Sequence, residues 1–423
     1  MPCSITVAPF ILTLTIFTSC VFTAPSPSSF RRDITDPFSY APGFDIQKVA
    51  SVAESLPSHS WEYGTAVEML LELYNPELSV FGDAPFDQKA NSFDGVKALT
   101  YAKSHIVLNL ADAAGANILI DGDGATGDPA SLGTSAVMLG KSDDLYKEAA
   151  ERTMGYLVGT APRYWNGAIS QRADVAELWA DFVYMAPPFL AYYAVDTSNS
   201  TLLYEAVRQC FTYRQILQQP ALLSSTAGLW QHIVGPQSAD SGLWSTGNAW
   251  AAAGMTRVLA TVTKAPEYLF ESLLASKVQI IGELTGYIQE IIDGALGSSF
   301  DGGLLRNYMN DDNSFGEISG TTLIASVIYR MAVLQPSIFY PSSTYLTFAN
   351  SVLSLLGSED STGEPHISSG GIAQPVVNPL NWFDPVPITA VNGTGSPEGQ
   401  NFVVLMYAAW RDCVSFGICS ENY

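Results

Sequence analysis

The side chains best suited to chemistry in this sequence are carboxylates that stand next to aromatic residues. Asp181 lies between Trp179 and Tyr184 in the segment 172–193, whose apolar residues recur at helical spacing. Glu177 stands four residues earlier, so the sequence predicts both acids on one helix face, where they repel each other. Repulsion and partial exclusion of water both favour a proton on Asp181, as a general acid requires. A solvated acidic helix face is the alternative interpretation.

A second set of carboxylates belongs to a loop rich in glycine and aspartate. Asp121, Asp123 and Asp128 stand ahead of a helical pattern at 130–139. Hydrolysis of a glycosidic bond commonly needs two carboxylates, one protonated and one charged, so Asp128 is the candidate partner of Asp181. A calcium loop is the competing interpretation, although the glutamate that ends an EF-hand loop is missing.

Aromatic and hydrogen-bonding side chains also gather in the segment 228–250. Trp244 and Trp250 offer faces that stack on sugar rings, while Asn248 and His232 can bond to hydroxyl groups. Such a set is typical of a carbohydrate site. The alternatives are a helix N-terminus that places Trp250 in the core, and a purely structural His232.

Other chemistries lack their residue patterns. The histidines are isolated, and the sequence contains no H-E-x-x-H motif, nucleophile elbow, phosphate loop or dinucleotide fingerprint, so we expect no cofactor and no metal. A formal net charge of −22 repels phosphate backbones and anionic lipids, which disfavours nucleic acid and membrane surfaces as partners. An anionic substrate would need a local cation, and Arg163, Arg172 and Arg306 are the candidates.

The first residues indicate secretion to the extracellular space. Residues 1–24 are apolar and uncharged, as in a signal peptide, and 25–36 form a flexible lead rich in proline and serine. The sequons at Asn199 and Asn392 agree with this route and predict a glycoprotein.

Three cysteines remain beyond the predicted signal peptide. Cys413 and Cys419 are close enough in sequence to close a small loop, which would leave Cys210 buried and unpaired. With so few bridges, stability must come from a core, and a content of 47% hydrophobic residues is enough for a large one.

Helices must position these candidates, because strand signals are few and are confined to short hairpins near 165–170 and 299–309. No low-complexity linker divides the chain. We therefore expect one all-α domain over 37–423, whose antiparallel helix pairs close into a six-hairpin (α/α)6 ring. The predicted helices lie near 45–55, 61–74, 93–112, 130–139, 144–158, 174–195, 201–218, 247–263, 267–293, 319–334, 343–357 and 397–412.

Taken in order, several motifs resemble those of the unsaturated glucuronyl and rhamnogalacturonyl hydrolases, the six-hairpin enzymes of glycoside hydrolase families 88 and 105. Each match alone is weak, but their order through most of the chain is specific. The matching motifs are Trp61-Glu62-Tyr63-Gly64, Asp128 to Gly133, Trp179 to Met185 with Pro188 to Ala191, Trp244 to Trp250 after His232, Glu317 to Thr321, and Ser396 to Gly399.

The resemblance implies a reaction on a terminal 4,5-unsaturated uronic acid. Asp181 would be the general acid/base that protonates C4, after which water adds at C5 and the hemiketal opens to release the neighbouring sugar. Asp128 would help to hold the ring or the water, and no cofactor takes part. The implied partner is an oligosaccharide from pectin or another uronate-containing polymer.

The resemblance also implies binding residues. His232 would hydrogen-bond the substrate, Trp244 and Trp250 would stack on it, and the matching motifs add Tyr63 and Asn248.

One position departs from the family pattern. Thr246 stands where an arginine is expected to meet the substrate carboxylate, and Arg172 is the candidate substitute. Two alternatives therefore stay open: an ordinary glycosidase for neutral or saturated oligosaccharides that uses Asp181 and Asp128, and a sugar-binding protein without catalysis.

Overall fold

The structure, a computed structural model, describes residues 34–86, 93, 95–112, 114–120, 124–219, 226–273, 275–340 and 343–422. The predicted signal peptide and residues 25–33 of the predicted lead lie outside the described residues. Asp121 and Asp123, the core of the competing calcium interpretation, lie outside them as well.

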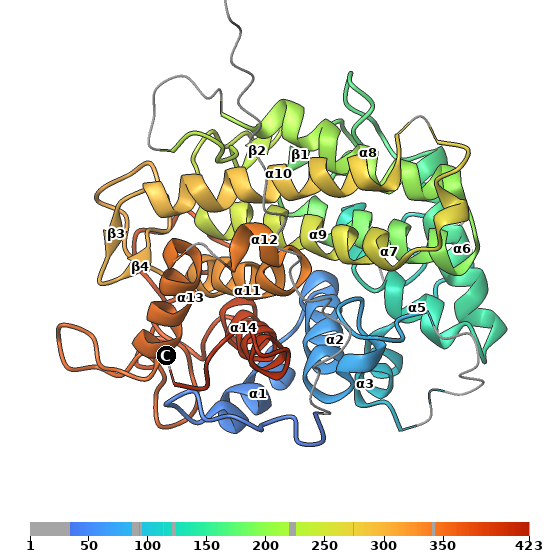
Figure 1. The fold of residues 1–423 in the computed structure, drawn as a ribbon. Helices are drawn as coiled ribbons and strands as arrows, with labels where there is room; N and C mark the ends of the chain where they lie inside the picture. The colour runs from blue at the N-terminus through green and yellow to red at the C-terminus, as the bar shows by residue number, and fades with distance from the viewer. Residues whose placement is uncertain are drawn as a thin grey trace, which may run out of the picture.

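Helices dominate the described chain, and the strands are four two-residue pieces (Figure 1). The pairs β1 (Leu178–Trp179) with β2 (Ile233–Val234) and β3 (Phe300–Asp301) with β4 (Leu304–Leu305) are both antiparallel. The helices are α1 (Ile46–Ser55), α2 (Ser60–Tyr74), α3 (Lys97–His105), α4 (Gly127–Ala130), α5 (Gly133–Leu139), α6 (Asp144–Gly159), α7 (Phe182–Asp196), α8 (Ser200–Leu217), α9 (Ser245–Lys264), α10 (Lys277–Gly297), α11 (Ile318–Leu334), α12 (Pro336–Phe339), α13 (Ser343–Leu356) and α14 (Pro397–Ser415).

Within the described chain, the helices α2, α5, α7, α9, α11 and α14 form a closed inner ring. Successive members pack against each other from α5 to α14, α14 packs back against α2, and the short α4 contacts both α2 and α7. The helices α1, α3, α6, α8, α10 and α13 each pack on the outside of an inner helix; Figure 1 shows α10 lying along α9, and α14 (red) beside α2 (blue). The predicted six-hairpin all-α domain is confirmed.

The inner helices are mostly apolar or small, and most of their buried charged side chains are paired, which is why they can be surrounded. In α9, every residue from Ser245 to Val262 is buried. Gly254 allows the closest approach in this ring, because a Cβ there would lie 2.1 Å from the carbonyl oxygen of Val183 in α7. Most predicted helices match the observed ones within a few residues.

The segment 172–193 was predicted as one helix, and that prediction is wrong in its first half. Residues before Phe182 form turns and β1. Glu177 therefore does not share a helix face with Asp181: its carboxylate accepts hydrogen bonds from the Trp179 indole at 2.8 Å and from the backbone N–H groups of Gln237 and Ser238. These bonds satisfy Glu177 outside a helix.

Pro187 and Pro188 lie inside α7, as they do in the helix predicted near 174–195. The helix continues through both residues to Asp196, and both prolines are buried. The prolines remove two backbone donors, but burial on all sides of α7 holds the helix together through its packing.

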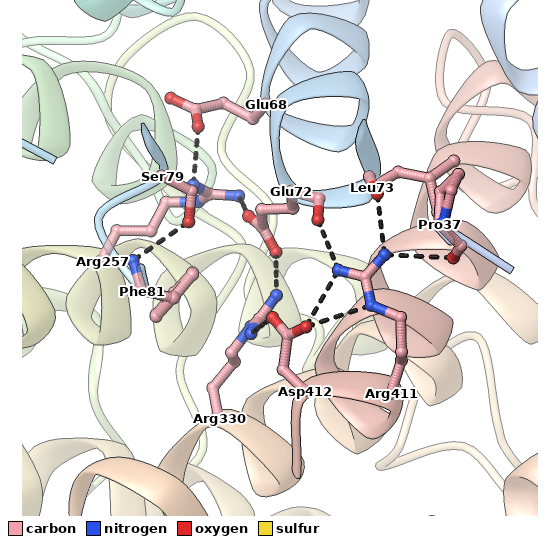
Figure 2. Close-up of polar contacts among 10 residues, drawn as sticks. All are labelled: Pro37, Glu68, Glu72, Leu73, Ser79, Phe81, Arg257, Arg330, Arg411 and Asp412. Atoms are coloured by element: carbon pink, nitrogen blue, oxygen red, sulfur yellow. Dashed lines mark hydrogen bonds and ion pairs between the residues drawn. The ribbon is translucent and has the colours of Figure 1, made fainter. Parts of the chain in front are cut away.

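A network of buried ion pairs joins four inner helices (Figure 2). Arg257 of α9 contacts Glu68 at 2.8 Å and also Glu72, both on α2. Arg330 of α11 reaches Glu72 at 2.6 Å and Asp412 of α14 at 2.5 Å. Because each charge is buried, losing one partner would leave the other uncompensated in a low-dielectric interior.

Arg411 extends this network to the backbone (Figure 2). Its guanidinium donates to the carbonyl oxygens of Glu72 and Leu73, each at 2.7 Å, and to that of Pro37 at 3.1 Å. It also contacts the Asp412 carboxylate at 2.9 Å. The first and last helices of the ring are thereby tied together.

Cys413 and Cys419 form a disulfide, and Cys210 is buried as a free thiol, as the sequence predicts. None of the described helices is long and apolar enough to cross a membrane.

Candidate active site

A cavity of about 270 Å³ lies where the N-terminal ends of several inner helices meet. Its lining includes residues at or just before the first turn of α2, α4, α7, α9 and α14. Helix N-termini carry partial positive charge, so this end of the ring favours a negatively charged ligand. The lining residues are His59, Trp61, Asp128, Gln171, Arg172, Trp179, Asp181, Met185, His232, Trp244, Pro379, Leu380, Trp382 and Glu398.

Asp181 and His232 meet in this cavity. The pairing of β1 with β2 brings them together: the backbone N–H of Ala180 donates to the carbonyl oxygen of His232 at 2.9 Å. Nε2 of His232 lies 3.3 Å from Oδ2 of Asp181. Apart from this contact with each other, neither atom has a hydrogen-bond partner in the described chain, so a ligand can approach both.

Asp240 holds the other side of the histidine ring. Its Oδ2 lies 3.1 Å from Nδ1 of His232 and accepts hydrogen bonds from the Tyr308 hydroxyl at 2.6 Å and the Trp382 indole at 3.2 Å. The imidazole is completely buried and stands between two carboxylates, which fixes its orientation.

These contacts set the charges of His232 and Asp240. Burial opposes a positive charge on His232, but the carboxylates of Asp181 and Asp240 outweigh it, so the pKa of His232 is raised. Burial likewise opposes ionisation of Asp240, but hydrogen bonds from His232 and Tyr308 lower its pKa to about 2. The arrangement favours an imidazolium beside Asp181.

Asp128 and Arg172 lie on neighbouring parts of the wall. The backbone N–H of Thr126 donates to the Gln171 carbonyl oxygen at 2.7 Å, and Nε2 of Gln171 donates to Oδ1 of Asp128 at 2.6 Å. Arg172 is the one arginine or lysine in the lining as far as the structure describes it. Its nearest recorded carboxylate is that of Asp174, at 3.9 Å, and its buried Nε has no hydrogen-bond partner among the described residues.

Four tryptophans give the cavity its apolar surface: Trp61, Trp179, Trp244 and Trp382. The rings of Trp179 and Trp382 are 5.4 Å apart and nearly perpendicular, and Trp244 lies 4.4 Å from His232. Trp61 uses its indole N–H to donate to Oε1 of Glu398 at 3.0 Å. Aromatic faces next to polar atoms are the surfaces that sugars prefer.

Unpaired buried polar atoms cluster in this cavity. Such atoms are rare in folded proteins, and each one calls for a partner such as a ligand or water. Five lining residues supply one each in the described chain: Gln171 (Oε1), Arg172 (Nε), Asp181 (Oδ2), His232 (Nε2) and Glu398 (Oε2).

The model of Glycosyl Hydrolase Family 88 matches residues 133–396, more than half of the chain. The chain belongs to this family. The protein is therefore an enzyme, a glycoside hydrolase that acts on carbohydrate.

Comparisons with individual proteins agree with this family assignment. The chain is 22% identical over 284 residues to an unsaturated rhamnogalacturonyl hydrolase, YesR, of Bacillus subtilis, covering 64% of this chain and 74% of the relative. Its fold is similar to that of a possible family 105 member from Salmonella enterica, with a TM-score of 0.61, 16% identity and coverage of 86% and 92% of the two chains. It is also similar to an unsaturated glucuronyl hydrolase from Bacillus sp. GL1, with a TM-score of 0.54, 12% identity and coverage of 86% and 94%.

The structure of this family 88 hydrolase brings together five of the residues proposed from the sequence. The cavity is lined by Asp128, Arg172, Asp181, His232 and Trp244, which together span more than a hundred residues of the sequence.

Three other proposed residues are not in the lining. Trp250 is fully buried, its ring 4.5 Å from those of both Tyr184 and Phe402. Asn248 uses its side chain for backbone groups, accepting from the Trp230 N–H at 2.7 Å. Tyr63 stacks on His105 at 4.2 Å. Trp250 is thus a core residue, as the alternative interpretation held.

Thr246 also lies outside the lining. It is fully buried and donates to Oε1 of Glu317 at 3.2 Å. The position where the family pattern has arginine therefore contributes no group to this cavity, which leaves Arg172 as the guanidinium that does.

Sequence reasoning missed several lining residues. Glu398 belongs to a recognised motif, but an acid in the first turn of a helix is ordinary, so nothing marked it as functional. Trp382 comes from a loop without a motif. Asp240, which accepts its indole N–H, lies within the segment 228–250 but was not singled out there, and it stands behind the lining. Among the described residues, no three His, Cys, Asp or Glu side chains gather so as to hold a metal ion.

Proposed function

We propose that this family 88 hydrolase hydrates the 4,5 double bond of a terminal unsaturated uronic acid on an oligosaccharide. The observation that carries the proposal is the open Oδ2 of Asp181, 3.3 Å from a buried histidine, in a cavity that also holds one guanidinium. The name of the Bacillus subtilis relative supports the same substrate class.

Asp181 and His232 act as the proton source. With Asp240 favouring the imidazolium, the Asp181–His232 pair holds a proton that can reside on either side of their 3.3 Å contact. Transfer of this proton from the Asp181 oxygen to C4 forms a C–H bond and leaves positive charge at C5 and the ring oxygen. Water adds at C5 and gives up a proton to the pair, and the hemiketal opens to release the neighbouring sugar.

Arg172 recognises the uronate carboxylate in this proposal. It lines the cavity, its Nε has no hydrogen-bond partner in the described chain and only a 3.9 Å contact with Asp174, and a guanidinium matches a carboxylate with two parallel hydrogen bonds. Asp128, held by Gln171, positions the sugar ring or the water, and Trp179, Trp244 and Trp382 exclude bulk solvent.

The test uses oligosaccharides produced by lyases from pectin, alginate and glucuronan, whose conjugated double bond absorbs in the ultraviolet. We expect the absorbance to fall with at least one of them, and Asp181→Asn to abolish the loss while the protein stays folded. Asp144→Asn, an exposed change on α6, is the matched control. If no absorbance is lost with any of these substrates, the proposed reaction is wrong.

A second candidate is ordinary hydrolysis of a saturated glycoside, favoured by the presence of Asp128 in the same cavity as Asp181. Release of reducing ends from saturated oligosaccharides, abolished by Asp181→Asn, would support it. If catalysis is absent and calorimetry detects only binding, the sugar-binding alternative holds instead.

We also propose that the protein is a secreted glycoprotein. Residues 1–24 have the composition of a signal peptide, the Cys413–Cys419 bridge suits an oxidising compartment, and both sequon asparagines are exposed. When the full chain is expressed in a secreting host, the protein should be recovered from the culture medium without its leader, and it should lose mass on deglycosylation. A product retained in the cell at full length would contradict this.

A further inference from the structure

Glu398 is an acid in the cavity for which the proposed reaction has no role. It lies in the first turn of α14 and is only 3% exposed. Its Oε1 accepts the Trp61 indole N–H at 3.0 Å. Its Oε2 is buried in the cavity wall and has no hydrogen-bond partner in the parts of the chain described. A buried oxygen open to the cavity is placed to meet a ligand.

The charges that act on Glu398 are negative. Asp181 from the start of α7, Glu62 from α2 and Glu317 from the start of α11 all oppose its ionisation. Burial adds to this repulsion as the largest effect, so the pKa of Glu398 lies well above its ordinary range. The α14 dipole acts the other way, but it is the weaker influence on a group taken out of water.

The basic groups of the cavity lie near carboxylates other than that of Glu398. His59 lies 3.5 Å from Glu62, and His232 lies between two aspartates. Arg172 is nearest to Asp174, at 3.9 Å. None of the three is among the groups that lower the pKa of Glu398.

The two oxygens of Glu398 therefore have different roles. A protonated carboxyl has one O–H donor and one carbonyl acceptor. Because Oε1 already accepts from Trp61, the hydrogen belongs on Oε2, which faces the cavity.

We propose that Glu398 is a substrate-contacting residue that keeps a proton on Oε2 and donates it as a hydrogen bond to an oxygen of a bound uronic acid. The proton has a second effect. An ionised Glu398 would add a negative charge beside Asp181 and Asp128 and repel an anionic sugar, whereas the neutral acid attracts one. The choice of an anionic sugar rests on the proposed function, but the hydrogen bond does not require turnover.

The experiment measures the binding of D-galacturonate and D-galactose by calorimetry, from mildly acidic to mildly alkaline pH. Glu398→Gln keeps the size and a hydrogen-bond donor but cannot ionise, Glu398→Ala removes both, and the exposed Glu364→Gln is the matched control. Circular dichroism and thermal melting establish that each variant is folded.

We expect the wild-type protein and the Glu364→Gln control to bind galacturonate more tightly than galactose at mildly acidic pH, and to lose that preference as pH rises. At acidic pH the Gln variant should bind galacturonate as tightly as the wild type does. Its affinity for galacturonate should fall much less than that of the wild type as pH rises. The Ala variant should bind galacturonate about tenfold or more weakly than the wild type at acidic pH, the loss expected for a hydrogen bond to a charged group, and should also lose most of the alkaline decline.

Any of three results would overturn the proposal. The first is a Gln variant that no longer binds galacturonate at acidic pH, since Glu398 would then act as an anion. The others are a Gln variant whose galacturonate affinity falls with rising pH as much as that of the wild type, and a wild type that does not prefer galacturonate to galactose. The outcome is separable from that of the proposed function. If binding behaves as expected but no unsaturated substrate is turned over, only the reaction is wrong; if turnover occurs and any of the three results is obtained, only Glu398 is misassigned.

Discussion

Replacing Asp240 by asparagine should shift the alkaline side of the pH–rate profile to lower pH. The change keeps the size of the side chain, and its oxygen can still accept from Tyr308 and Trp382. It removes the negative charge 3.1 Å from Nδ1 of His232. Since that charge helps to raise the pKa of His232, the imidazolium beside Asp181 should lose its proton at lower pH.

The size of the shift follows from the distance. Two unit charges 3.1 Å apart interact by about 5 kcal/mol at an effective dielectric constant of about 20. One-fifth of the Asp240 side chain is exposed, and water there screens the charge. Neighbouring opposite charges commonly shift a pKa by about 1–3 units, and we take the lower half of that range. The alkaline limb should therefore move down by about 1–2 pH units, or about 1.4–2.7 kcal/mol.

The assay is the rate of loss of ultraviolet absorbance at saturating and at low substrate, measured across pH for wild type, Asp240→Asn and the Asp144→Asn control. Nuclear magnetic resonance gives an independent reading, because the sequence has only four histidines and the His232 resonance can be assigned from a His232→Gln variant. If the alkaline limb and the His232 titration both stay in place, Asp240 does not act through His232 and the reasoning is refuted.

Four further predictions concern other parts of the molecule. Arg172→Gln should raise KM for a uronate substrate about 10- to 100-fold with a smaller change in kcat, whereas equal losses for neutral and anionic sugars would argue against carboxylate recognition. Trp250→Phe should lower the free energy of unfolding by about 1–3 kcal/mol in denaturant titrations and leave KM unchanged; a large rise in KM would return Trp250 to the site. Cys413→Ser should destabilise by about 2 kcal/mol, since the bridge closes a short loop; an unchanged melting temperature would contradict this. Asp240 should stabilise the fold above pH 3.8, its unfolded pKa, and lose that stabilisation as pH falls towards its folded pKa of about 2, so Asp240→Asn should flatten acid unfolding there.

The fold could be predicted from the sequence because its helices and its loops differ in residue pattern. Periodic apolar residues mark the inner and outer helices alike, and the loops between them are rich in turn formers. The failure at 172–181 has a local cause. Val175, Leu178 and Trp179 fit helical spacing, but the backbone N–H of Glu177 bonds to the Ser170 hydroxyl, and its carboxylate bonds to distant backbone groups. The periodicity of apolar residues carries no information about such hydrogen bonds.

The site was only half predictable, for reasons of geometry. Trp244 and Trp250 look equivalent in the sequence, yet Trp244 precedes α9 and Trp250 lies six residues on, about 9 Å further along the helix axis. That distance separates the cavity wall from the core. Glu398 and Trp382 could not be singled out, because their importance depends on tertiary contacts. One oxygen of Glu398 accepts an indole N–H and the other has no hydrogen-bond partner in the described chain. Trp382 donates to Asp240, which also contacts His232.

The ion network between the inner helices has a consequence for the folding of the chain during synthesis (Figure 2). Asp412 and Arg411 belong to the last helix, and they neutralise Arg330 and bind carbonyl groups of the first inner helix. During synthesis, α2, α9 and α11 emerge before these partners exist, so Arg330 lacks one of its two carboxylates until the final 19-residue helix is complete. Ring closure is thereby coupled to the completion of α14. A chain that stops before this helix would leave Arg330 with one of its two carboxylates and the α2 carbonyl groups without Arg411, so we expect no stable partial enzyme.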